Sequence, residues 1–262
     1  MMMRTKSWIL LIALFLSCSL KLSAQETRCL CTDSLADTTH KFTYPQLIIP
    51  AALIGVGVIG LGSDWLKFQN QEIRNELKET IDDKITIDDF SQYVPLLAVY
   101  GLNLSGVKGL HNFRDRTTIL ATSYLIMGVT VNSLKHLTHE ERPVGSSFDS
   151  FPSGHTATAF MGAEFLWQEY KQTSPWIGVA GYAVAAGTGA FRIYNNRHWL
   201  TDVLAGGGIG ILSTKIAYWV YPSIQKRLYR KSKSKKNNVF SNALAVPYYN
   251  GESAGVSFQA SF

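Results

Sequence analysis

The chain has 262 residues, of which 46% are hydrophobic and only 17% are charged, and its formal net charge is +6. A charged fraction below the usual value of about 25% excludes a disordered polar chain and argues against an ordinary soluble domain. Seven of the basic residues lie between Lys226 and Lys236, so the rest of the chain has no diffuse basic surface and no nucleic-acid partner is expected.

The N-terminal residues have the pattern of a secretory signal. A positive start is followed by the apolar run Trp8–Leu20 and by a site suited to cleavage after Ala24. We therefore expect residues 1–24 to be a signal peptide, and the alternative is an uncleaved anchor. Either form directs the chain to the bacterial cell membrane. Residues 25–41 are expected to be an N-terminal linker.

Six apolar stretches follow, and together they predict an all-α fold, a six-helix membrane bundle over residues 42–225. The stretches are Phe42–Ser63, Phe90–Val107, Thr117–Leu134, Thr156–Tyr170, Gln172–Phe191 and Leu200–Tyr221. A stretch of about 20 apolar residues is long enough to cross a bilayer. Two of them carry charges, Glu164 in one and Asp202 and Lys215 in another, and charges within spans usually face the bundle interior.

The segment Asp64–Asp89 between the first two stretches has eight acidic and four basic residues and is expected to form an amphipathic surface helix around Ile73, Leu77 and Ile81. The loop before the third stretch and the tail after the sixth are basic. The positive-inside rule therefore places them in the cytoplasm, and places residues 135–155 and 192–202 on the periplasmic face. A cleaved signal followed by six full crossings would invert this orientation, so either the first stretch does not fully cross or the signal is not cleaved.

The C-terminal residues differ from the bundle in pattern. Residues 226–238 are expected to be a basic linker, and residues 239–262 a C-terminal extension. Within the extension, Ala243–Tyr249 and Ala254–Phe262 flank an Asn-Gly pair, which is a strong signal for a short β-hairpin. The alternative is an extension without fixed structure.

Three short segments carry the residues that indicate chemistry. They are Lys135 with Arg142-Pro143, the run Pro152-Ser153-Gly154-His155, and Arg192 with His198 and Asp202. If the spans alternate in direction, all three segments lie at one membrane face. Lys135, Arg142 and Arg192 have no acidic run nearby to neutralise them, and such cations bind tetrahedral oxyanions. Ser153 and Gly154 begin a helix, where free N–H groups favour an anion.

The two histidines suit phosphoryl transfer. His198 and Asp202 are four residues apart and would share one face of a helix, so the carboxylate could fix the ring tautomer and leave the other nitrogen free to attack. His155 would supply the second proton-transfer group. Cys29 and Cys31 have no further Cys or His nearby at metal-ligand spacing, and no metal site or cofactor is expected. His40, His111, His136 and His139 are interpreted as surface histidines, and Glu164 with Lys215 as a buried or interfacial polar pair.

In this order, Lys-x6-Arg-Pro, Pro-Ser-Gly-His and Arg-x5-His-x3-Asp resemble the three signatures of the type 2 phosphatidic acid phosphatase (PAP2) superfamily, which also includes vanadium haloperoxidases. The resemblance implies that His198 is a nucleophile oriented by Asp202 and that His155 is the general acid and base. It also implies that Lys135, Arg142, Ser153, Gly154 and Arg192 bind the phosphate. Phe191 departs from the small residue that the family commonly has before the third-motif Arg.

The resulting prediction is a metal-independent phosphatase that acts on a membrane lipid phosphate from the periplasmic side. Candidate substrates are undecaprenyl pyrophosphate, phosphatidic acid, phosphatidylglycerol phosphate and lipid A phosphates, and the motifs do not choose among them. One alternative is a vanadate-dependent haloperoxidase. The other is a protein that binds or transports a lipid phosphate without turnover. The oligomeric state is open.

Overall fold

The structure is a computed structural model that describes residues 43–80, 86–235, 242–249 and 254–261. The expected signal peptide and N-terminal linker lie outside the described residues. The described helices are α2 (Pro45–Gly62), α3 (Asp64–Thr80), α4 (Asp88–Ser91), α5 (Val94–Leu104), α6 (Phe113–Thr138), α7 (Gly154–Tyr170), α8 (Pro175–Tyr194) and α9 (Leu200–Lys235). Strands β1 (Asn242–Tyr249) and β2 (Ala254–Ser261) follow.

Each of the six apolar stretches contains a helix, so the predicted all-α class of the bundle is confirmed. The number of full crossings is not. Among the described helices, three are long and apolar enough to cross a membrane: Pro45–Gly62, Phe113–Thr138 and Leu200–Arg227. The second stretch is divided into α4 and α5, and the 11 residues of α5 rise only about 16 Å, roughly half of a bilayer core.

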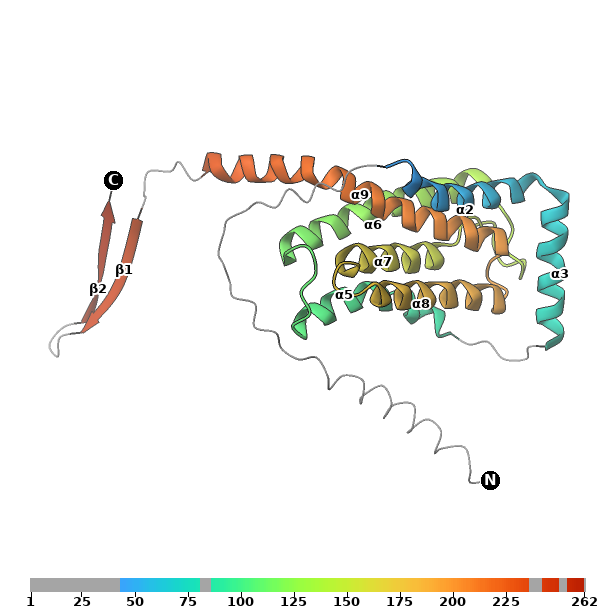
Figure 1. The fold of residues 1–262 in the computed structure, drawn as a ribbon, viewed down its shortest axis with the longest axis horizontal. Helices are drawn as coiled ribbons and strands as arrows, with labels where there is room; N and C mark the ends of the chain where they lie inside the picture. Colours follow the sequence, from blue (N-terminus) through green and yellow to red (C-terminus); the bar gives the residue numbers. More distant parts are fainter. Residues whose placement is uncertain (1–42, 81–85, 236–241, 250–253, 262) are drawn as a thin grey trace, which may run out of the picture. The chain divides into compact units, whose positions relative to one another are not determined.

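Helix α7 is the centre of the bundle, and most of its side chains are buried. It packs against α5, α6, α8 and α9, and Figure 1 shows it flanked by these four helices. Two glycines of α9 allow the closest approach. A Cβ on Gly206 would collide with the Ser153 carbonyl, and one on Gly210 would collide with the Ala157 carbonyl. Small residues therefore fix the start of α9 against the start of α7, where two of the predicted motifs lie.

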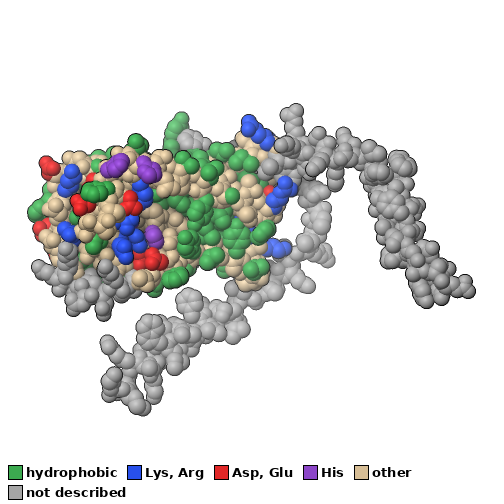
Figure 2. All heavy atoms as spheres, turned by 180° about the vertical axis from the view of Figure 1, so that it is seen from behind, with side chains coloured by type: hydrophobic (Ala, Val, Ile, Leu, Met, Phe, Trp, Pro, Cys, Tyr) green, Lys and Arg blue, Asp and Glu red, His purple; other side chains and the backbone are tan. Residues whose placement is uncertain are grey.

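Helix α2 is continuous from Pro45 to Gly62 although Pro50 lies inside it. Two of its glycines serve packing, because a Cβ on Gly57 or Gly60 would collide with Thr201 or Ala205 of α9. The other side of α2 is exposed, with Ile48, Ile49, Val58 and Ile59 at its surface, and α6 exposes Leu125 and Val129. Figure 2 shows hydrophobic side chains across the middle of one face and charged side chains mainly toward its ends. This distribution suits an integral membrane protein.

The segments outside the bundle follow the sequence pattern only in part. The predicted amphipathic surface helix is α3, which ends at Thr80. Asp88 and Asp89, the last two acids of the predicted segment Asp64–Asp89, lie in the separate helix α4. Helix α9 continues to Lys235, so most of the predicted basic linker is helical. Further on, β1 and β2 pair antiparallel, with Asn242 opposite Ser261 and Tyr249 opposite Ala254.

Two polar clusters lie within the bundle. Lys215 Nζ is 2.8 Å from Glu164 Oε1, which confirms the predicted polar pair. At the end of the bundle where α7 terminates, Glu169 accepts hydrogen bonds from Tyr218 and from the backbone of His111, and contacts the His111 ring and Arg116. The interpretation of His111 as a surface histidine is therefore wrong, because its ring is held by a buried carboxylate.

Candidate active site

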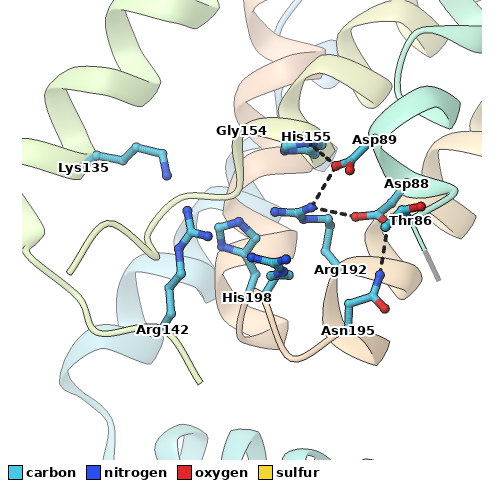
Figure 3. Close-up of a pocket in the computed structure, with 11 residues that line it drawn as sticks. Thr86, Asp88, Asp89, Lys135, Arg142, Gly154, His155, Arg192, Asn195 and His198 are labelled. Carbon is cyan, nitrogen blue, oxygen red and sulfur yellow. Dashed lines mark hydrogen bonds and ion pairs between the residues drawn. The ribbon is translucent and has the colours of Figure 1, made fainter. Parts of the chain in front are cut away.

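The three predicted motifs meet at one pocket of about 490 Å³ at the end of the bundle where α7 begins. Helices α6 and α8 end there, α4, α7 and α9 start there, and the connecting loops complete the walls. The pocket is lined by Thr86, Asp88, Asp89, Lys135, Arg142, Gly154, His155, Arg192, Asn195, Arg197 and His198. Figure 3 shows His198 and Arg192 near its middle, with His155 and Asp89 on one side and Arg142 and Lys135 on the other.

His198 is held by the loop that precedes α7. Its Nδ1 lies 2.8 Å from the Ser150 carbonyl oxygen, and its side chain is buried. Because a carbonyl oxygen only accepts hydrogen bonds, Nδ1 carries the proton and Nε2 carries the lone pair in the neutral ring. His198 therefore lines the pocket in the tautomer that a nucleophile needs.

Asp202 does not make the expected hydrogen bond to His198. Its Oδ2 lies 3.6 Å from His198 Nδ1, beyond hydrogen-bond distance. That oxygen instead accepts hydrogen bonds from Ser150 Oγ at 2.5 Å and from the Trp199 N–H at 2.9 Å. Asp202 thus fixes Ser150, and the Ser150 carbonyl fixes the ring. The sequence could not reveal this relay, because any residue can supply a backbone carbonyl.

Burial is the strongest influence on His198. It lowers the pKa of the ring, the nearby Asp202 carboxylate acts in the opposite direction, and Arg192 and Lys135 lower it further, to about 4. A pKa well below 7 keeps the imidazole neutral at physiological pH. The second histidine, His155, lies in the first turn of α7, and its Nε2 is 3.1 Å from Asp89 Oδ1.

The expectation that the three cations lack acidic neighbours is wrong. Arg142 Nη2 donates to Asp149 Oδ2 at 2.9 Å, and Lys135 Nζ donates to the Asp149 backbone carbonyl at 2.5 Å. Arg192 Nη1 donates to Asp88 Oδ2 at 2.6 Å. These acids pre-position the cations, since long basic side chains would otherwise adopt many rotamers.

The pairing leaves capacity for an anion. Arg192 is buried, and its Nε–H has no hydrogen-bond partner among the described residues. A buried N–H without an acceptor costs free energy until a ligand satisfies it. Asp149 remains ionised in this setting: burial acts to raise its pKa, but hydrogen bonds from Ser147 and Arg142 outweigh burial and lower the pKa to about 2.

Ser153 and Gly154 occupy different positions relative to the pocket. Gly154 lines it at the first turn of α7, where backbone N–H groups have no acceptor within the helix. Ser153 is buried and does not line it. Its hydroxyl shares a 2.9 Å hydrogen bond with Thr156, and its N–H donates to the Asp202 carbonyl. The Ser153 hydroxyl and N–H thus both have partners within the protein, and phosphate binding by Ser153 stays a prediction.

Five lining residues were not among the predicted site residues: Thr86, Asp88, Asp89, Asn195 and Arg197. Asn195 Nδ2 donates to Asp88 Oδ1 at 3.0 Å, so α4 is connected to the loop that carries His198. The sequence does indicate where α4 lies. If helices alternate in direction, the segment that ends at Asp89 lies on the same face as the three motifs.

Comparison with known proteins matches residues 116–226 to the PAP2 superfamily. This part of the chain therefore matches the family that the three motifs predict. A lipid A 1-phosphatase of Porphyromonas gingivalis is 35% identical over 233 residues, which cover 83% of this chain and 51% of that protein. The bacitracin transport permease protein BcrC of Bacillus licheniformis is 32% identical over 76 residues, covering 29% of this chain and 36% of that protein. The chain thus spans about half the length, or less, of these relatives.

Two solved structures resemble the chain more distantly. LpxE of Aquifex aeolicus has a TM-score of 0.44 and 24% identity, and the match covers 57% of this chain and 94% of that one. A transmembrane PAP2-type phosphatidylglycerolphosphate phosphatase of Bacillus subtilis has a TM-score of 0.44 and 18% identity, with 69% and 97% covered.

Proposed function

We propose that the chain is a phosphatase that hydrolyses a membrane lipid phosphate through a phosphohistidine intermediate. One observation carries the proposal: His198 and His155, from separate segments, line the same pocket as Lys135, Arg142 and Arg192. Two imidazoles beside a set of fixed cations provide a nucleophile, a proton donor and charge stabilisation for one phosphoryl group. A protein that only binds phosphate would need the cations alone.

In the first step, the lone pair on His198 Nε2 attacks phosphorus. The bond from phosphorus to the leaving oxygen breaks, and that oxygen receives the proton from His155 Nε2. Arg142, Arg192 and Lys135 stabilise the charge on the three equatorial oxygens. The Gly154 N–H, at the start of α7, adds a backbone donor.

In the second step, His155 accepts a proton from water, and the water oxygen attacks phosphorus. The bond from phosphorus to His198 Nε2 breaks, inorganic phosphate leaves, and both histidines return to their starting states. The Asp202–Ser150 contact holds the His198 ring in its tautomer through both steps. Asp202 is accordingly a positioning residue that acts through Ser150.

Lipid A 1-phosphate is the first substrate to test, because the Porphyromonas gingivalis relative, which matches 83% of this chain, is described as a lipid A 1-phosphatase. The apolar outer surfaces of α2 and α6 would lie among the lipids whose headgroup enters the pocket. The basic residues Lys226 and Arg227 of α9 lie toward the end of the bundle away from the pocket. By the positive-inside rule, this position of the basic residues supports a pocket at the periplasmic face.

The test is to trap the intermediate. Purified protein in detergent is mixed with lipid A carrying radiolabelled phosphate and quenched, and we expect acid-labile, base-stable label on the wild type. His198→Ala should carry no label, while His136→Ala, an exposed histidine at the same end of the bundle, should behave as the wild type. Phosphate release should persist in EDTA.

Each contrary result has a distinct meaning. Complete loss of release in EDTA would contradict the metal-independent mechanism. Release without trapped label would contradict the phosphohistidine. Phosphate binding without release would identify a binding protein. Parallel assays with undecaprenyl pyrophosphate, phosphatidic acid and phosphatidylglycerol phosphate would then identify the lipid.

A further inference from the structure

The pocket has a cationic side and an acidic side. Lys135 and Arg142 lie on one side, Asp88 and Asp89 on the other, and Arg192 between them (Figure 3). Asp88 is buried, and its Oδ2 is 2.6 Å from Arg192 Nη1, so its charge is closely compensated. The Asp89 side chain is 52% exposed, and its Oδ1 is 3.6 Å from the same nitrogen. Its other partner is His155, at 3.1 Å, so the Asp89 charge is left available once His155 has given its proton to the leaving group.

Asp89 also lies beside the group that meets the leaving oxygen. Its Oδ1 is 3.1 Å from His155 Nε2, the atom that delivers the proton in the first step. A leaving group that takes this proton must pass next to the Asp89 carboxylate. A neutral alcohol with further hydroxyl or amide groups can donate hydrogen bonds to that carboxylate. An anionic leaving group is repelled by it, because like charges a few ångströms apart raise each other's free energy.

We infer that Asp89 is a specificity-determining residue that selects phosphate monoesters of neutral, hydroxyl-bearing alcohols over diphosphates. This inference rests on the proposed function and names the substrate class of the same site. With a monoester, the leaving oxygen belongs to the alcohol and takes the His155 proton, so the product is neutral. With a diphosphate, the bridging bond to phosphorus breaks and the departing group is itself a phosphate monoester, whose negative charge lies beside Asp89.

The experiment uses two substrates that share one alcohol, farnesyl phosphate and farnesyl diphosphate, presented in detergent to the full-length protein. We expect the wild type to have the higher kcat/KM for the monophosphate. Asp89→Asn, which removes the charge and keeps the shape, should raise kcat/KM for the diphosphate about 10-fold, equivalent to about 1.4 kcal/mol. Asp64→Asn removes the same charge from an exposed position on α3 outside the pocket, and should match the wild type.

The direction of the change separates repulsion from proton transfer. If Asp89 acted only through His155, Asp89→Asn would lower turnover of the monophosphate and leave the diphosphate unchanged. That result overturns the inference, as does a wild type that prefers the diphosphate.

A binding measurement decides the same question without turnover. In titration calorimetry with inorganic phosphate and methylenediphosphonate, Asp89→Asn should bind the diphosphonate about 10-fold more tightly and phosphate with little change. An unchanged diphosphonate affinity overturns the inference. Failure of the wild type to release phosphate from either lipid overturns the proposed function instead, and the calorimetry still decides the role of Asp89.

Discussion

The two ends of the bundle use the same kinds of side chain for different purposes. At the end where α7 begins, histidine, arginine and aspartate surround a pocket of about 490 Å³. At the end where α7 terminates, His111, Arg116 and Tyr218 surround Glu169. There the carboxylate accepts at 2.7 Å from the Tyr218 hydroxyl and contacts the His111 ring at 2.7 Å, and its side chain is fully buried.

The difference lies in where the carboxylates are. Glu169 is at the centre of its cluster, so the cationic and polar groups converge on it. Around the pocket, Asp88 lies on one side of the lining and Asp149 lies outside it, and each is paired with an arginine. The cationic groups then face a space that a phosphate can fill. A central carboxylate makes a structural cluster, whereas peripheral carboxylates make a binding site, and variants at each end should separate stability from activity.

The largest expected effect is at the end where α7 terminates, around Glu169. Glu169→Ala should lower the free energy of unfolding by about 3–5 kcal/mol, because it leaves the Arg116 guanidinium, which is 1% exposed, without its buried counter-charge. Thermal unfolding in detergent measures the loss. The protein that remains folded should keep its kcat, since the pocket lies at the other end.

Glu72→Gln, at an exposed position of α3, is the control for removal of a carboxylate and should leave stability unchanged. A Glu169→Ala protein that is as stable as the wild type would contradict the structural role of this cluster. A folded variant with reduced kcat would show that the two ends are coupled.

At the end that carries the pocket, a variant should lose activity and keep its stability. Arg142→Ala removes a donor to the phosphate oxygens and should lower kcat about 10²–10³-fold. Stability should change little, because the partner left behind, Asp149, is 46% exposed and can be solvated. Arg142→Lys should recover part of the activity, since lysine keeps the charge but loses the planar fork.

Phosphate release and thermal unfolding, measured on the same preparations, test this expectation. Arg114→Ala, which removes a cation at the far end of α6, should retain full activity. If Arg142→Ala loses stability in proportion to activity, the pocket cations are structural and the comparison between the two ends fails.

Alternating helix directions predicted that the three motifs lie at one end of the bundle, because they stand at or near helix ends that the apolar pattern locates. Lys135, His155, Arg192 and His198 could therefore be placed at one end of the bundle by alternating the direction of the helices. The same alternation places Asp88 and Asp89 at this end of the bundle, but an acidic segment is usually a solvated surface, so their role in the pocket has no signal in the sequence. Their contacts with Arg192 and His155 depend on how α4 packs against α7 and α8, which is a tertiary feature.

Other features lie beyond pattern reasoning for different reasons. The spacing of His198 and Asp202 predicted a direct hydrogen bond, but it holds only if both residues are in one helix. In the structure α9 begins at Leu200, so His198 is in the preceding loop and its ring turns to the Ser150 carbonyl. The two strands of the predicted β-hairpin are different, because a local alternating pattern indicates them, and they pair with Val246 opposite Ser257.

The smallest expected effect is the pH dependence of stability that comes from the buried ring of His198. The pKa of His198 is about 4 in the folded protein, against an ordinary value of 6.5, mainly because burial disfavours the charged ring. Between pH 6.5 and 4 the unfolded chain therefore binds a proton at this histidine that the folded protein does not. By linkage, the free energy of unfolding falls as the pH is lowered through this window, by at most about 3 kcal/mol.

Thermal unfolding of the wild type and of His198→Gln between pH 7 and pH 4 measures this contribution. The glutamine variant cannot take up the proton, so its stability should depend less steeply on pH over the same range. Burial should keep the ring neutral and nucleophilic until the pH approaches 4, so the acid limb of kcat/KM that belongs to His198 should lie near that pH. Equal pH slopes for the two proteins would mean that the pKa of His198 is not lowered in the folded protein. The expectation that burial keeps this ring a neutral nucleophile would then be wrong.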